Sequence, residues 1–127
     1  MKKALYLFAI TLIFMSCQAQ QKKEVKLVSP EQFSQEIVKD KGQLIDVRTP
    51  NEYSAGHIEG AQNINLHDDS FTVQINKLDK KQTVYVYCKA GRRSAEASSV
   101  LKQNGFKNVV ELDGGTDAWT AAGKPLK

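Results

Sequence analysis

The stretch TVYVYCKAGRRS, Thr83–Ser94, joins a strand pattern to a helix start through a single cysteine. Its first five residues, 83–87, are β-branched or aromatic, which favours a buried central strand. Gly91 permits the backbone angles of a tight loop. A helix is expected from Ser94 to Asn104, with the Ser94 hydroxyl as its N-cap. The stretch therefore predicts a strand, a tight loop that begins at Cys88, and a helix.

The rest of the chain alternates short apolar runs with helix-like segments. Two helix starts are marked by an N-cap residue followed by proline, at Ser29-Pro30 and at Thr49-Pro50. This alternation predicts one α/β domain, with a mostly parallel five-stranded sheet and helices on both faces. The expected strands are 25–28, 43–47, 61–66, 83–87 and 108–112, and further helices are expected at 70–78 and 116–122.

The composition is that of a folded globular chain of one domain. The 127 residues are 41% hydrophobic and 25% charged, which argues against disorder. The formal charge is +4, and it falls to +2 (16 basic, 14 acidic) without Lys2 and Lys3, which are expected to be removed. Such a weak bias does not indicate nucleic acid or membrane-surface binding.

The first residues have the pattern of an export signal. Lys2 and Lys3 form a basic start, and residues 4–15 form an uncharged apolar run of 12 residues. As a helix this run spans ~18 Å, short of the ~30 Å hydrocarbon core, so it predicts a signal segment and not a membrane span. A buried amino-terminal helix is the alternative, but the run has no amphipathic period.

Cys17 follows Ser16 at the place where a bacterial lipoprotein signal carries its lipid-modified cysteine. Phe14 and Met15 depart from the commonest pattern of that signal, which leaves ordinary cleavage near Ala19 as the alternative. Both alternatives predict the periplasmic side of the cell envelope, and the first adds a lipid anchor at Cys17. The expected parts are a signal peptide at 1–16, a tether at 17–26 and a folded domain at 27–127.

Cys88 is left unpaired once Cys17 is lipidated or removed. An inert buried cysteine is the simplest alternative, because cysteine is among the most buried residue types. The loop after Cys88 argues against it, since its backbone N–H groups and the following helix start place positive partial charge near the sulfur. Together with the basic side chains of the loop, they favour a thiolate and attract small anions. A thioredoxin-like role fails because no Cys-x-x-Cys pair exists.

Arg93 follows Cys88 in the spacing Cys-x4-Arg. Cysteine phosphatases use Cys-x5-Arg, a wider loop sized for phosphate, and usually have histidine at the place of Tyr87. The shorter loop makes a tighter cradle that suits a single sulfur atom better. Phosphatase and arsenate reductase chemistry are therefore disfavoured.

Four separated motifs lie along the chain. They are LIDVR at 44–48, EYSAGHIEGAQNI at 52–64, CKAGRRS at 88–94, and LDGG at 112–115 with Ala118-Trp119 after it. In this order, with the cysteine at a strand-to-loop junction, they resemble the rhodanese family of sulfurtransferases. The resemblance covers residues 25–126, nearly all of the expected folded part.

The resemblance implies a thiosulfate sulfurtransferase with Cys88 as its catalytic nucleophile. Cys88 would attack the outer sulfur of thiosulfate or a similar donor, release sulfite, and pass the persulfide sulfur to cyanide, a thiol or a partner protein. Arg93 aligns with the family's loop arginine, which would hold the anionic donor. The substrate-binding residues so implied are Lys89, Ala90, Gly91, Arg92 and Arg93. No cofactor and no metal are expected.

Two other classes of function compete with the enzyme. One is a relay or binding module of the envelope, with a protein as sulfur donor or acceptor and without efficient thiosulfate turnover. The other is a purely structural lipoprotein. Retention of Cys88, Gly91 and Arg93 argues against an inert module but not against a relay.

Asp46 and Arg48 resemble the family's Asp-x-Arg near the site, and Ser94 lies at its edge. For Arg48 the favoured interpretation is a structural ion pair with Glu52. Asp46 is a candidate to orient the loop by accepting its N–H groups. The Ser94 hydroxyl either caps the helix, which is favoured, or lines the site.

Three further residues are interpreted as structural or exposed. The motif around His57 predicts a turn, because an ionised cysteine needs no base. Trp119 is expected to pack the last helix. His67 lies beside two aspartates on a loop expected to be exposed, which does not predict a metal site.

Overall fold

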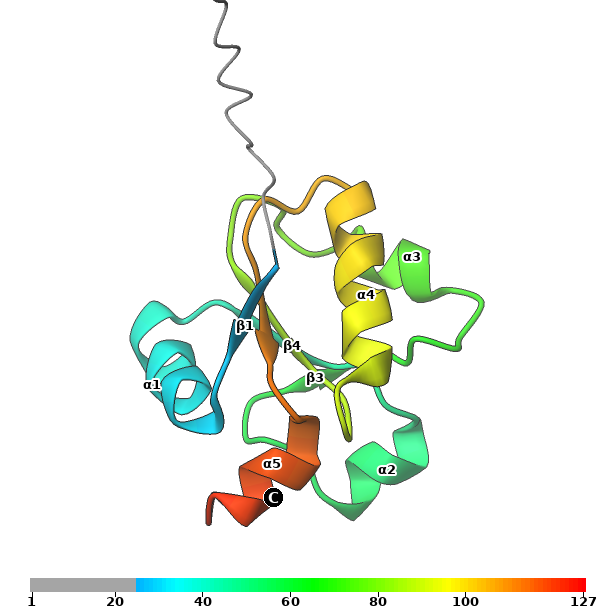
Figure 1. Ribbon diagram of the computed structural model, residues 1–127. Coiled ribbons are helices and arrows are strands. Elements are labelled where there is room, and N and C mark those ends of the chain that lie inside the picture. The colour runs from blue at the N-terminus through cyan, green and yellow to red at the C-terminus, as the bar shows by residue number, and fades with distance from the viewer. Residues whose placement is uncertain (1–24) are drawn as a thin grey trace, which may run out of the picture.

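Strands and helices alternate along residues 25–127, the part of the chain that the computed structural model describes (Figure 1). None of the helices there is long and apolar enough to cross a membrane. The predicted signal peptide, Cys17 and most of the predicted tether lie outside the described residues and stay predictions. The strands are β1 (Lys26–Val28), β2 (Gln43–Asp46), β3 (Gln62–Asn63), β4 (Val84–Tyr87) and β5 (Val109–Leu112), and the helices are α1 (Pro30–Asp40), α2 (Pro50–Ala55), α3 (Phe71–Ile75), α4 (Arg92–Gln103) and α5 (Gly115–Ala121).

The strands form one sheet in the order β1-β5-β4-β2-β3, and every pair in it is parallel. β4 is the central strand, as the run of β-branched and aromatic residues predicts. Its last residue, Tyr87, lies beside Asp46 of β2, and Val86 lies beside Glu111 of β5. The single α/β domain with a five-stranded parallel sheet is therefore confirmed.

Helices cover both faces of the sheet (Figure 1). The side chains of β4 belong to both of the core clusters that flank the sheet. Val84, Val86 and Cys88 belong to the cluster under α3 and α4. Tyr85 and Tyr87 alternate with them and belong to the cluster that contains Phe33 of α1 and Trp119 of α5. This alternation puts the Cys88 side chain in the layer beneath α4.

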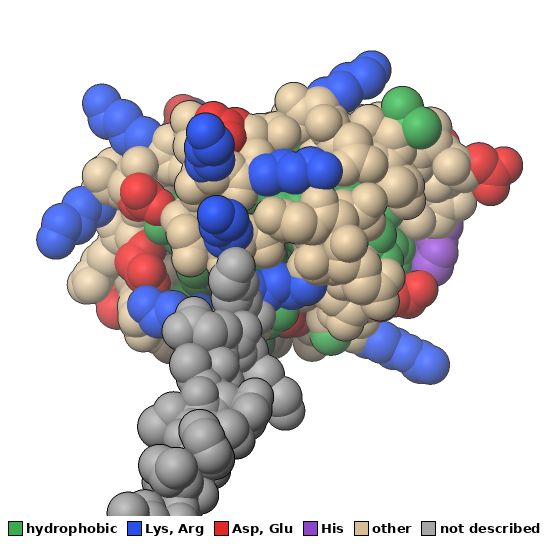
Figure 2. Space-filling view, turned by 90° about the horizontal axis from the view of Figure 1, so that it is seen from above, with side chains coloured by type: hydrophobic (Ala, Val, Ile, Leu, Met, Phe, Trp, Pro, Cys, Tyr) green, Lys and Arg blue, Asp and Glu red, His purple; other side chains and the backbone are tan. Residues whose placement is uncertain are grey.

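The amino ends of the strands form a surface of mixed charge. Figure 2 views this end and shows basic and acidic side chains interspersed, with hydrophobic side chains visible only in small separate areas. On the visible part of this face the basic side chains are separated by acidic and polar surface (Figure 2).

The carboxyl ends of the strands carry the site. There α2, α5 and the first turn of α4 come together (Figure 1). The first turn of α5 holds the loop after β4: the N–H of Thr116 donates to the carbonyl of Cys88, and the N–H of Asp117 donates to that of Lys89, both at 2.9 Å. These N–H groups are among those a helix start leaves free.

Gly115 is what allows α5 to approach the loop so closely. A Cβ atom at Gly115 would overlap the carbonyl oxygens of Cys88 and Lys89, and its φ of +60° lies in the left-handed region. Gly115, the second glycine of the LDGG motif, is therefore required by the contact between α5 and the loop.

We expect Gly115→Ala to lower the free energy of unfolding by about 3 kcal/mol, because it adds a clash with two carbonyls to the cost of a left-handed alanine. Gly123→Ala is the matched control. Its φ is +78° and nothing lies within 4 Å of its added Cβ, so it should cost only about 1 kcal/mol. Urea unfolding of both variants checks this, and equal losses would contradict the role given to the contact.

Candidate active site

Cys88 lies directly after β4, at the base of the loop that leads into α4. Only 1% of its surface is exposed. The N–H of Gly91 donates to Cys88 Sγ at 3.1 Å, and the thiol donates to Ser94 Oγ at 3.4 Å. Gly91 has φ 112°, a left-handed conformation that turns the chain into the helix. The loop therefore directs a backbone donor at the sulfur, as its glycine predicts.

Ser94 is not the N-cap of α4, and that prediction is wrong. The helix begins at Arg92 with Gly91 as its N-cap, because the left-handed glycine makes the turn without a capping hydroxyl. Ser94 is instead buried in the first turn, where its hydroxyl lies 2.7 Å from Glu111 Oε1 and 3.1 Å from the Gly91 carbonyl. Ser94 Oγ also accepts from the Cys88 thiol at 3.4 Å, and the alternative in which Ser94 lines the site stays a prediction.

Glu111 is a site residue that the sequence analysis missed. It lies in the middle of β5 and only 6% of its surface is exposed. Burial raises its pKa, the hydroxyls of Ser94 and Ser98 act in the opposite direction, and Asp113 adds to the rise. Its signal in the sequence is a charged residue inside the apolar run Val109–Leu112, where a buried strand seldom holds an acid.

The other residues of the loop face the solvent. Lys89 is exposed and pairs with Asp117 of α5 at 2.9 Å. Ala90 and Arg92 are exposed as well. The substrate-binding roles expected for these three residues stay predictions. Because the Lys89 ammonium already has a carboxylate partner, its charge adds less to the field at the loop than the sequence alone suggests.

Arg93 forms a two-point ion pair with Glu52 of α2, at 2.6 and 2.9 Å. The hydrogen bonds from Arg93 lower the pKa of Glu52 to about 2, against the effect of burial and with help from Thr49. Glu52 is thus ionised in the neutral pH range and holds Arg93 at the edge of the loop. Any anion that binds to Arg93 would therefore compete with the Glu52 carboxylate.

Arg48 pairs with Asp46 and not with Glu52, so the predicted ion pair is wrong. The Arg48 guanidinium bonds both carboxylate oxygens of Asp46, the shortest distance being 2.6 Å, and donates to the Gly56 carbonyl at 2.6 Å. Both side chains are buried. The backbone N–H that Asp46 accepts is that of Arg48 and not one from the loop. The pair therefore fixes the segment around α2, which carries Glu52.

The three residues interpreted as structural or exposed, His57, Trp119 and His67, have the following surroundings. His57 stacks on Tyr53 with ring centres 3.8 Å apart, and its Nδ1 lies 2.9 Å from the Tyr53 carbonyl. Trp119 is buried and packs edge-on against Phe33. His67 is exposed. Within residues 25–127, no three His, Cys, Asp or Glu side chains are grouped to hold a metal ion.

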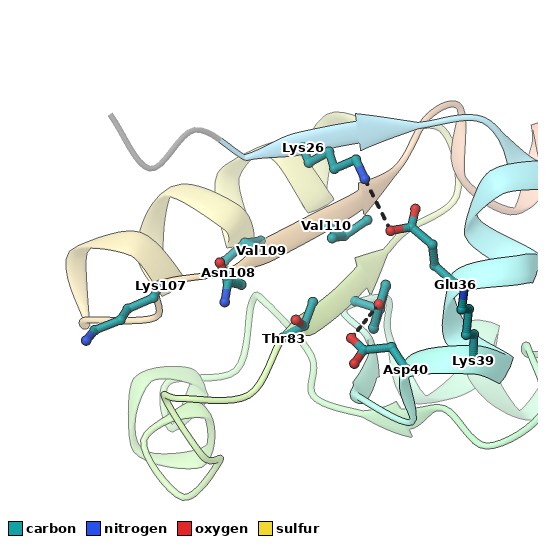
Figure 3. Close-up of a pocket in the computed structure, with 10 residues that line it drawn as sticks. Lys26, Glu36, Lys39, Asp40, Thr83, Lys107, Asn108, Val109 and Val110 are labelled. Carbon is teal, nitrogen blue, oxygen red and sulfur yellow. Dashed lines mark hydrogen bonds and ion pairs between the residues drawn. The ribbon is translucent and has the colours of Figure 1, made fainter. Parts of the chain in front are cut away.

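One hollow in the described residues lies away from Cys88. It measures about 750 Å³ and is open between α1 and the amino ends of β4 and β5 (Figure 3). Within it the Lys26 ammonium donates to Glu36 at 3.2 Å, and the Tyr85 hydroxyl donates to Asp40 at 2.7 Å. Since Cys88 follows the opposite end of β4, this hollow is not part of the site.

Comparison with known proteins agrees with this geometry. The model of the Rhodanese-like domain family matches residues 29–122. The uncharacterized protein YqhL of Bacillus subtilis (strain 168) is 36% identical over 116 residues, which cover 91% of this chain and 89% of that protein. Thiosulfate sulfurtransferase PspE of Escherichia coli (strain K12) is 40% identical over 70 residues, which cover 55% of this chain and 67% of PspE.

Solved structures share the fold. The crystal structure of a rhodanese-related protein from Thermoplasma volcanium has a TM-score of 0.71 at 26% identity, covering 80% of this chain and 97% of the other. The family match spans β2 to β5, the loop after β4 and the five helices. The chain described here belongs to the family of rhodanese-like domain proteins.

Proposed function

We propose that this protein is a thiosulfate sulfurtransferase that carries sulfur as a persulfide on Cys88. Its family and its similarity to a named sulfurtransferase support a role in sulfur transfer or sulfur relay. The observation that carries the finer proposal is the 3.1 Å bond from the Gly91 N–H to Cys88 Sγ, at the start of α4. A backbone donor and a helix start at the sulfur stabilise negative charge there.

In the first half of the reaction, the Cys88 thiolate attacks the outer sulfur of thiosulfate. The sulfur–sulfur bond of the donor breaks, sulfite leaves with the bonding electron pair, and Cys88 becomes a persulfide anion. Arg93 holds the anionic donor in exchange for part of its contact with Glu52. The Gly91 N–H and the first turn of α4 then face the charge on the persulfide.

In the second half, an acceptor removes the outer sulfur of the persulfide. Cyanide attacks that sulfur, thiocyanate leaves, and the Cys88 thiolate is restored. The burial of Cys88 favours a donor that presents one small sulfur atom, because only 1% of the residue is exposed. A thiol or the cysteine of a partner protein can act as acceptor by the same attack.

The test is thiocyanate formation by the full chain from thiosulfate and cyanide. We expect turnover by the wild type and none by Cys88→Ser, because a serine hydroxyl does not form a persulfide. Lys107→Ala, an exposed change at the amino end of the sheet, is the matched control and should keep wild-type turnover.

Two outcomes oppose the enzyme proposal. If the wild type forms no thiocyanate but Cys88 accepts sulfur from a protein persulfide, the protein is a relay and not a thiosulfate sulfurtransferase. If Cys88→Ser retains turnover, Cys88 is not the nucleophile. Either result would replace the mechanism above.

We also propose that the chain is exported and anchored in the cell envelope through a lipid on Cys17. The basic start, the apolar run at 4–15 and the pair Ser16-Cys17 support this. A fatty-acid probe fed to expressing cells should label the wild type and Cys88→Ala, but not Cys17→Ala. Equal labelling of all three variants, or labelling of none, would refute the anchor.

A further inference from the structure

A continuous path of hydrogen bonds joins Cys88 to Glu111. The Cys88 thiol donates to Ser94 Oγ at 3.4 Å, and the Ser94 hydroxyl donates to Glu111 Oε1 at 2.7 Å. All three residues are buried, with exposed fractions of 1%, 0% and 6%. Each step runs in the same direction, from the sulfur through the hydroxyl to the carboxylate. A proton can therefore move along this path without entering solvent.

A salt bridge, the usual reason for a buried carboxylate, does not explain the position of Glu111. A carboxylate in the middle of a buried strand is costly unless a cation pairs with it, and no salt bridge joins Glu111 to a basic side chain in the described residues. Its hydrogen-bond donor is the hydroxyl that also contacts the nucleophile. The contact that offsets the cost of burying Glu111 is therefore its hydrogen bond with Ser94, which also contacts Cys88, and not a salt bridge.

We propose that Glu111 is a positioning residue that holds the proton of Cys88 during sulfur transfer, acting through Ser94. This inference rests on the proposed function. In the first step Cys88 gives its proton to Ser94 Oγ while Ser94 gives its own to Glu111. A thiol and a carboxylate become a thiolate and a carboxylic acid, and the total charge does not change.

After this transfer the three residues remain hydrogen-bonded to one another, but each hydrogen bond is donated in the opposite direction. The protonated Glu111 donates to Ser94, and Ser94 donates to the thiolate, which also keeps the Gly91 N–H. The proton stays on Glu111 while Cys88 carries the persulfide. When the acceptor removes the outer sulfur, the proton returns through Ser94 to Cys88. Burial supports this exchange, because it raises the pKa of Glu111 and so favours the protonated acid.

The charged groups around the path are few. Asp113 follows Glu111 by two residues and lines the same hollow of about 360 Å³ together with Gly91. Arg93 is near enough to Cys88 to feel its charge and is paired with Glu52. The helix α4 presents the hydroxyl of Ser94 to Glu111 at 2.7 Å. Asp113 is therefore the natural control for an effect of negative charge alone.

The test follows the alkylation rate of Cys88 from about pH 5 to about pH 10, in the full chain, with iodoacetamide and mass spectrometry of the Cys88 peptide. In the wild type the rate should rise in two steps, because Cys88 and Glu111 share protons as a coupled pair. Glu111→Gln should show one step, since an amide accepts no proton at these pH values. Asp113→Asn should keep both steps.

A second measurement follows the single-turnover rate of persulfide formation from thiosulfate near pH 7. We expect Glu111→Gln and Ser94→Ala each to slow it by about 10-fold to 100-fold, a typical size for assisted proton transfer. The double variant should be no slower than Ser94→Ala alone, because both changes interrupt one path. Melting temperatures of the variants show whether each one is folded.

The outcomes separate this inference from the proposed function. If the wild type forms thiocyanate while Glu111→Gln keeps the wild-type alkylation profile and rate, the proton path is refuted and the sulfurtransferase stands. If the alkylation profile changes from two steps to one but the wild type forms no persulfide, the path stands and the proposed reaction is wrong. Additive losses in the double variant would also overturn the path.

Discussion

The contact between the start of α5 and the carbonyls of Cys88 and Lys89 is the constraint on which the site depends. Two N–H groups of α5 bind these carbonyls, which fixes the orientation of the peptide units that follow the sulfur. Gly115 makes the approach possible, and Gly91 then turns the chain so that its own N–H reaches Cys88 Sγ. The backbone, rather than the basic side chains, is what directly contacts the sulfur.

A second set of contacts, made by carboxylates, reduces the positive charge of the basic residues that follow Cys88. The buried pair Asp46–Arg48 fixes the segment around α2, and α2 presents Glu52 to Arg93. Lys89 is neutralised in the same way by Asp117. Two of the three cations that follow Cys88 therefore have carboxylate partners. An anion that binds to Lys89 or Arg93 would have to compete with these carboxylates.

The sequence was sufficient to predict the order of the elements, the parallel sheet and the position of Cys88, because these depend on local pattern. The start of α4 was misplaced because Ser94 looks like a cap, whereas the left-handed Gly91 provides the turn. The partner of Arg48 was wrong because nearness in sequence does not reveal which carboxylate is buried. Glu111 was missed since its contact with Ser94 joins two elements that only the folded sheet brings together.

The claim that Cys88 carries the sulfur is tested most directly by mass spectrometry of the full chain after exposure to thiosulfate without an acceptor. The peptide that contains Cys88 should gain the mass of one sulfur atom, and the gain should disappear when cyanide is added. A Cys88 peptide that gains no sulfur under these conditions would contradict the account, as would a gain that cyanide does not remove.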